Sequence, residues 1–414
     1  MKKIIQNNKG NDILLIGAIL IYLLITICPF LDSLSNWYVT MIPVGIILFF
    51  LLKGRMLQTT LRFLLIALCI AIFNFIFFTF RNDFLTYVSR QIVTWTPCLI
   101  ALLCVNYLST KSQKLILQIA LVAMMITSYT TIIGLEIYPM AARELAGAAT
   151  EATREQYMHI NLGGFDFIYA LVISIPVVFW MIDHTKGWLK ILNIAVLLLF
   201  LYCIYMSAYA TALLLTIIEL LLIVVDKNPK TKPFIITAGI VFIIFAGTGI
   251  LSSFVMWVSS LVESDYVADR LQQVALLLQG TSAEDVDTNT SNDRLLLTQQ
   301  AINGFFNSPI WGNNITGYTK SAMSGHSYLL DLLSASGIVG FSLYVFLFVK
   351  LFKIFFAEKF RNNAFQTRIA WLAFIALAFV NPVFFPIIFM VIFTFSVIIG
   401  QLEEEALYVK QQTR

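Results

Sequence analysis

Charged residues are scarce in this chain. Asp, Glu, Lys and Arg together make up 12% of its 414 residues, whereas 59% are hydrophobic and 14% are aromatic. An average soluble domain carries about 25% charged residues. A chain with so little charge cannot cover its apolar surface in water, which excludes a soluble globular protein. The composition therefore predicts an all-α polytopic membrane protein.

Several kinds of site are also missing. The sequence has no Gly-rich phosphate loop with a lysine, and no cluster of His and carboxylate residues at metal-ligand spacing. We therefore expect no cofactor, no metal and no nucleic-acid partner. Any reaction would need a substrate that was activated beforehand. The cysteines all lie in apolar runs and are predicted to be buried thiols: Cys28, Cys69, Cys98, Cys104 and Cys203.

Long apolar runs predict about twelve transmembrane helices. Because the first run is too long for a signal peptide and lacks a cleavage site, we interpret it as a retained span. The last two runs flank Asn381-Pro382. The alternative interpretation is that these two runs form one kinked re-entrant element. The predicted spans are 13–33, 37–52, 63–80, 91–108, 115–138, 165–182, 191–207, 211–225, 233–259, 328–349, 369–380 and 384–400.

These runs define the expected organisation. Residues 1–259 hold spans one to nine, 260–327 form a large outside loop, 328–400 hold spans ten to twelve, and 401–414 are a cytoplasmic tail. Within the loop, apolar residues at helical spacing predict an amphipathic helix over 264–278. A second helix is predicted from Asn292 or Asp293 to about Phe306, where Pro309 stops it.

The basic residues orient the predicted spans. With the N-terminus inside, 20 of the 27 Lys and Arg residues fall in inside segments. This bias follows the positive-inside rule and requires an even number of spans. We therefore expect a multi-pass membrane protein with both termini in the cytoplasm.

Arginine predominates among the basic residues of the segments predicted to lie outside. Of the seven outside cations six are arginines, whereas fifteen of the twenty inside cations are lysines. The planar guanidinium binds phosphate through two parallel hydrogen bonds, so this face suits a phosphate or diphosphate ligand. The alternative is that the arginines pair with outside carboxylates. The candidates for substrate binding are Arg90, Arg143, Arg154 and Arg270, with Arg294 in the second loop helix.

One histidine lies where it has access to a polar substrate at the membrane edge. His326 immediately precedes span ten, and an imidazole there accepts a proton near neutral pH. Asp331 follows it inside the span, where an ionisable group usually faces a cavity. Arg294 lies in the first turn of its helix, and this cation opposes the helix dipole unless it binds an anion. Capping or interfacial roles for these side chains are the alternative.

The order of these residues resembles a known family. Arg294 is followed by Ser308-Pro309-Ile310-Trp311-Gly312, then by Gly325-His326-Ser327-Tyr328-Leu329-Leu330, then by Gly337-Ile338-Val339-Gly340. With the late outside loop, this pattern resembles the O-antigen ligase and polymerase (Wzy/WaaL-like) superfamily, and most of all its polysaccharide repeat-unit polymerases. The resemblance covers residues 294 to 340.

The resemblance implies a function. It suggests a glycosyltransferase on the outer face of the bacterial cytoplasmic membrane. The enzyme would polymerise undecaprenyl-diphosphate-linked oligosaccharides into O-antigen, capsule or exopolysaccharide. His326 would take the proton of the acceptor hydroxyl, Arg294 would stabilise the departing diphosphate, and Asp331 and Tyr328 would line the sugar site. Membrane lipids, a flippase and a chain-length regulator are the implied partners. The alternatives are a ligase with another acceptor, or a lipid-linked oligosaccharide flippase or transporter without enzymatic activity.

The chain departs from the family at one place. The family often carries an arginine in the outside turn between spans seven and eight, but here that turn reads Met206-Ser207-Ala208-Tyr209-Ala210-Thr211-Ala212-Leu213. Arg270, Arg90 or Arg154 would have to replace it, or the phosphate is held differently. The departure favours a polymerase over a ligase.

Overall fold

A computed structural model describes most of the chain, in two units that we treat separately. It describes residues 9–35, 37–53, 84–145, 150–227, 250–261, 268, 272, 291–313, 327–353 and 365–412. The first unit comprises residues 1–207, 339–376 and 383–414, and the second comprises 208–338 and 377–382. The described residues form helices and turns and contain no strand, as the composition predicts.

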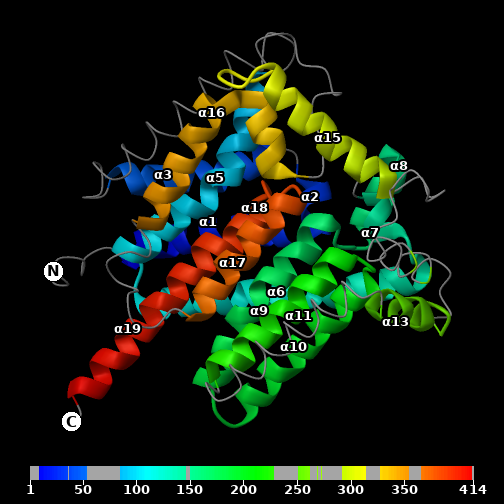
Figure 1. Cartoon of the computed structure of the whole chain (residues 1–414). Helices are drawn as coiled ribbons and strands as arrows, with labels where there is room; N and C mark the ends of the chain where they lie inside the picture. Colours follow the sequence, from blue (N-terminus) through cyan, green and yellow to red (C-terminus); the bar gives the residue numbers. More distant parts are fainter. Residues whose placement is uncertain are drawn as a thin grey trace. The chain divides into compact units, whose positions relative to one another are not determined.

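The helices follow the order of the sequence (Figure 1). Those of the first half are α1 (Lys9–Ile27), α2 (Pro29–Leu34), α3 (Trp37–Lys53), α5 (Phe84–Asn106), α6 (Thr110–Ile137), α7 (Ala141–Arg143), α8 (Glu151–His159), α9 (Phe165–His184) and α10 (Trp188–Met206). Those of the second half are α11 (Ala210–Lys227), α13 (Ile250–Ser259), α15 (Ser291–Asn307), α16 (Tyr328–Phe352), α17 (Phe365–Val380), α18 (Pro386–Phe389), the π-helix η6 (Met390–Phe395) and α19 (Ser396–Gln412).

Five helical segments among the described residues are long and apolar enough to cross a membrane. They are Thr110–Ile137, Phe165–His184, Trp188–Met206, Tyr328–Leu351 and Pro386–Glu403, and shorter apolar helices accompany them. Each coincides with a predicted span, and α15 coincides with the second predicted loop helix. The total of twelve stays a prediction, because 63–80 and the first part of 233–259 lie outside the described residues, as does most of the amphipathic helix predicted over 264–278.

Three element boundaries differ from the prediction. The first apolar run does not continue to residue 33, because α1 ends at Ile27 and α2 begins at Pro29. A proline disfavours helical geometry in the residue before it, and Cys28 is extended there, with φ −101° and ψ 105°. Arg90 lies inside α5 and not in the loop before it. Finally, α19 continues to Gln412, so the predicted tail is mostly helical.

Around Asn381-Pro382 the structure has two helices and not one kinked element. α17 ends at Val380, and the next helix begins at Pro386 after residues without helical structure. The helical segment from Pro386 then contains the six-residue π-helix η6, all of whose side chains are buried.

A proline inside α5 determines one contact in the core of the first unit. Pro97 has no backbone N–H, so the carbonyl of Val93 loses its usual helical donor. The hydroxyl of Tyr22 on α1 donates to that carbonyl at 2.7 Å, and the Tyr22 side chain is fully buried. The hydroxyl of Thr394 on η6 donates to the carbonyl of Pro97 itself at 3.0 Å. The proline therefore links α5 to two other helices.

Aromatic packing fills the same region. The ring of Trp95 lies 5.1 Å from that of Phe389 and 5.6 Å from that of Phe348, measured between centroids. Phe389 in turn lies 5.4 Å from Phe393 in an edge-to-face arrangement. Such pairs contribute roughly 0.5–1.5 kcal/mol each beyond their buried area. This cluster holds α5, α16, α18 and η6 together.

We predict that Tyr22→Phe destabilises the protein by roughly 1–3 kcal/mol, because it leaves the partly buried Val93 carbonyl without a donor. The measurement is the thermal unfolding midpoint of the purified protein in detergent. Tyr129→Phe is the matched control, since Tyr129 on α6 is 58% exposed. Equal midpoints for the two variants would show that the Tyr22 bond contributes nothing to stability.

Candidate functional site

The structure describes the predicted site residues to different extents. His326 and Arg270 lie outside the described residues. For Arg90, Arg143 and Arg294 only the backbone is described: they lie in α5, in α7 and in the first turn of α15. Arg154, Tyr328 and Asp331 are described with their side chains. Arg154 belongs to the first unit, whereas Tyr328, Asp331 and the backbone of Arg294 belong to the second.

A tight turn ends α15 in the second unit. The helix stops at Asn307, as the following Pro309 predicts. The amide of Gly312 donates to the carbonyl of Ser308 at 2.9 Å, and the Ser308 hydroxyl donates to the carbonyl of Gly312 at 2.9 Å. Gly312 has a φ of 80°, which favours glycine. The Pro-x-x-Gly segment of the sequence is therefore a closed turn.

Asn313 joins this turn to α16. Its amide nitrogen Nδ2 donates to the carbonyl of Gly304 on α15 at 2.6 Å, and lies 3.2 Å from both the carbonyl and the hydroxyl oxygen of Ser334 on α16. Its backbone N–H also donates to the Ser334 carbonyl at 3.0 Å. One asparagine therefore connects the end of α15, the turn and α16.

A second contact between the turn after α15 and α16 depends on a glycine inside α16. Gly337 has a φ of 62° and a ψ of −171°, so the helix is broken at that residue. The break lets the N–H of Ile338 donate to the carbonyl of Pro309 at 2.9 Å. A Cβ on Gly337 would lie 2.4 Å from the carbonyl oxygen of Ile310, and one on Gly312 would lie 2.2 Å from that of Ala335. Both positions exclude any side chain. We call this contact between residues 308–313 and 334–338 the glycine junction.

The part of α16 that precedes Gly337 begins with a capped N-terminus. The hydroxyl of Ser327 accepts the N–H of Leu330 at 3.3 Å, which caps the helix. The N–H of Tyr328 donates to the carbonyl of Asn381 at 3.4 Å, and the Tyr328 side chain is half-buried. Asp331 lies one turn into the helix and is only 8% exposed. Burial of a carboxyl group at this point agrees with the prediction that it faces the interior.

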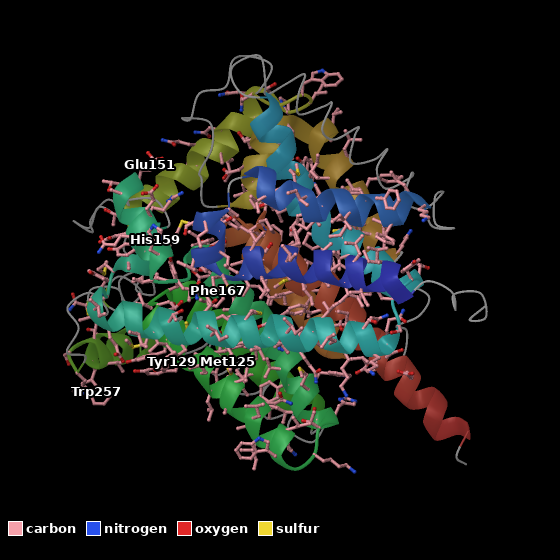
Figure 2. The ribbon with its side chains drawn as sticks, turned by 180° about the vertical axis from the view of Figure 1, so that it is seen from behind. Met125, Tyr129, Glu151, His159, Phe167 and Trp257 are labelled. Atoms are coloured by element: carbon pink, nitrogen blue, oxygen red, sulfur yellow. The ribbon has the colours of Figure 1, made fainter. Side chains whose placement is uncertain are left out.

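The first unit has a polar platform formed by α2, α7, α8 and the residues after α8. Asn161 is its centre, with a left-handed φ of 57°. Its Oδ1 accepts the N–H of Phe30 at 3.2 Å, and its Nδ2 donates to the hydroxyls of Thr127 and Thr130 at 3.2 and 3.0 Å. His159 packs its ring edge-on against Phe30, and Figure 2 shows it beside α2.

The arginine of this platform is engaged by the protein itself. Arg154 is exposed, donates weakly from Nη2 to the carbonyl of Leu145 at 3.4 Å, and interacts electrostatically with Asp166. Glu144 accepts the hydroxyl of Tyr157 at 2.6 Å, and this bond together with burial raises the pKa of Tyr157 to about 12. Whether Arg154 binds a phosphate or pairs with a carboxylate stays a prediction.

Sequence reasoning missed Asp32, which lies on α2. Asp32 is exposed at its surface, but partial desolvation by the surrounding protein and the nearby carboxylate of Asp166 raise its pKa to about 6. The two residues are 134 positions apart in the sequence. The proline after Cys28 could have revealed this in the sequence. It ends the first apolar run, so that Asp32 lies outside that run.

One buried carboxyl group stands apart. Glu219 on α11 is 1% exposed, and neither of its carboxyl oxygens has a hydrogen-bond partner among the described residues. The hydroxyl of Thr216, one turn earlier, is also buried without a partner there. Glu219 therefore has no hydrogen-bonded neighbour in the described part of the chain.

The turn that lacks the family's arginine has an unusual backbone. Ala208 adopts a φ of 53°, a conformation that side chains other than glycine rarely take. Comparisons with protein families, with curated proteins and with solved structures found no match for the chain.

We predict that Gly337→Ala disrupts the glycine junction, because the new Cβ would overlap the carbonyl of Ile310 in a backbone conformation that alanine avoids. The expected loss is about 3 kcal/mol or more of stability, measured as a lowered unfolding midpoint. Gly45→Ala is the control, since a Cβ there meets nothing within 4 Å in the described structure. An unchanged midpoint for Gly337→Ala would contradict the junction.

We predict a pH-dependent effect of Asp32→Asn. A carboxyl group whose pKa is raised by folding destabilises the folded state once it ionises, so its cost grows as the pH rises from about 4 to above 6. Asp32→Asn should therefore raise the unfolding midpoint at pH 7.5 and change it little at pH 4. Asp183→Asn, an exposed position, is the comparison. A stabilisation of Asp32→Asn that is equal at both pH values would contradict the raised pKa.

Proposed function

We propose that the protein is a polysaccharide polymerase that joins undecaprenyl-diphosphate-linked oligosaccharide units on the outer face of the bacterial cytoplasmic membrane. The proposal rests on the order of motifs between residues 294 and 340. The observation that carries it is the glycine junction, because it ties α15, whose first turn holds Arg294, to α16, which begins two residues after His326 in the sequence.

The junction fixes how these two helix starts are related within the second unit. α15 and the first half of α16 both run toward the junction, where they meet (Figure 1). Arg294 lies about 15 Å along α15 from Gly304, and Tyr328 lies about 9 Å along α16 from Ser334, at 1.5 Å per residue. Both helix N-termini therefore point away from the junction. The positive dipole end of each helix favours an anion near its own N-terminus.

The proposed reaction needs few groups. The anomeric carbon of the donor sugar is already bonded to a diphosphate, which is a good leaving group. The hydroxyl oxygen of the acceptor sugar attacks that carbon while His326 takes its proton. The bond from carbon to the diphosphate oxygen breaks, and Arg294 stabilises the charge on the departing lipid diphosphate. His326 then gives its proton to solvent.

The apolar surface of the protein suits a lipid-linked substrate. The polyprenyl chain stays in the bilayer, while the sugars and the diphosphate remain at the wet edge of the helices. Asp331 and Tyr328 lie in the first turn of α16, directly after His326, and are placed to line the sugar site. The reaction uses no nucleotide and no metal.

The test is a reconstitution. Purified protein in proteoliposomes receives a lipid-linked repeat unit without nucleotide, and the products are separated by length. A ladder of longer glycans supports a polymerase. A single transfer that requires a second acceptor would indicate a ligase. Absence of any product, with movement of the lipid-linked unit across the bilayer, would indicate a transporter.

We predict that His326→Ala and Arg294→Ala each reduce ladder formation by at least 100-fold, in the range expected for a general base or a group stabilising the leaving charge. Arg294→Lys should also be poor, because lysine lacks the bidentate fork. Gln299→Ala is the control, since Gln299 is exposed on the same helix. Full activity of Arg294→Lys would remove the proposed role of this arginine, provided that membrane insertion of all variants is equal.

A further inference from the structure

A groove on the first unit lies away from the proposed reaction. It has a volume of about 480 Å³, which is within the range of ligand-binding cavities. Its walls come from α6, α9 and α10, with Leu402 of α19. α10 packs against both α6 and α9, and each of the three helices is long and apolar enough to span a membrane. In a bilayer the groove would therefore open to lipid.

The helix register separates polar from apolar lining. The polar residues come from the first three turns of α6, the end of α9 and the first two turns of α10. They are Lys114, Gln118, His184, Thr185 and Asn193. The residues of the opposite end are apolar and include Met125, which Figure 2 labels on α6. Because α9 and α10 form a hairpin and α6 begins at the same end, all the polar residues gather at one end of the groove.

The polar end is built by specific contacts. The ring of His184 stacks on Trp180 with centroids 4.4 Å apart, and its Nδ1 lies 2.8 Å from the carbonyl of Trp180. This leaves Nε2 as its other polar atom. Asn193 donates from Nδ2 to the hydroxyl of Thr185 at 3.0 Å, and Thr185 donates to the carbonyl of Met181. The imidazole and the amide are therefore held in fixed positions.

Lys114 is the one lysine, arginine or carboxylate among the residues that line the groove. Lys114 lines the groove, is exposed and makes no ion pair among the described residues. Two carboxylates lie nearby without lining it. Glu403 is buried and accepts Trp180 Nε1 at 2.6 Å, and Asp183 precedes His184. A ligand head group at this end would therefore meet one cation and several neutral hydrogen-bonding groups.

The apolar wall remains uncovered. Val122 is 50% exposed, Leu189 is 54% exposed and Leu192 is 42% exposed, although they line the groove. We propose that the groove binds one anionic phospholipid, with its phosphate at Lys114 and Asn193 and an acyl chain along Val122 and Leu192. The basic residues of this end place it in the inner leaflet by the orientation argued above. The site is separate from the proposed polymerase chemistry.

The test measures lipid retention by the full chain. The purified protein in detergent is given equimolar dioleoylphosphatidylglycerol and dioleoylphosphatidylcholine, and native mass spectrometry counts the bound lipid of each kind. One phosphatidylglycerol should be retained in preference. Lys114→Gln should lower that preference about fivefold, the factor that one lysine contributes beside an anionic lipid surface.

A second variant tests the apolar part. Leu192→Trp should fill the groove and abolish retention of the lipid without affecting folding, because Leu192 is partly exposed. The controls are Lys111→Gln on α6 and Leu198→Trp on α10, which are exposed positions that do not line the groove. Equal retention of the two lipids by the unchanged protein would overturn the anionic head-group site. Preferential retention that survives both Lys114→Gln and Leu192→Trp would place the lipid elsewhere.

Discussion

The contact on which the second unit most depends is between two stretches of backbone. Gly312 and Gly337 let the turn after α15 approach α16 so closely that even one methyl group at either position would overlap a carbonyl. The N–H groups freed where α16 breaks are used again, since that of Ile338 reaches Pro309. A broken helix is tolerated inside a membrane protein when other groups satisfy its backbone in this way. The junction therefore fixes the direction in which both helices leave it.

Two regions of the first unit solve the same problem by different means. Around α5 a buried proline removes a hydrogen bond, and a tyrosine hydroxyl from α1 replaces it. In the platform after α8, the side chain of Asn161 bonds both to backbone and to threonine hydroxyls of α6. In each case a local departure from helical geometry becomes a connection between helices. An apolar chain gains few specific contacts from packing alone in lipid, so these polar links set which helices meet.

The two proposals use different parts of the helices. Arg294 lies in the first turn of α15, whereas the proposed lipid site lies between the sides of α6, α9 and α10. This division follows from the solvent. Helix N-termini at the membrane edge offer unpaired N–H groups and a positive potential to an anionic, water-soluble part of a substrate. The sides of spanning helices offer only apolar surface, apart from their ends. One protein can therefore hold a diphosphate at one place and an acyl chain at another without using the same groups.

The sequence by itself determined the all-helical membrane character, the positions of most apolar helices, and the start and end of α15, because hydrophobic run length, capping residues and proline act locally. It also placed Asp331 in the first turn of a helix. Only the tertiary structure decided that Gly312 meets Gly337, that Asp32 lies near Asp166, and that Arg154 interacts with Asp166. These contacts join residues from 12 to 134 positions apart, and no local preference encodes which distant segments meet. Their partners are chosen by packing and by the need to satisfy every buried polar group.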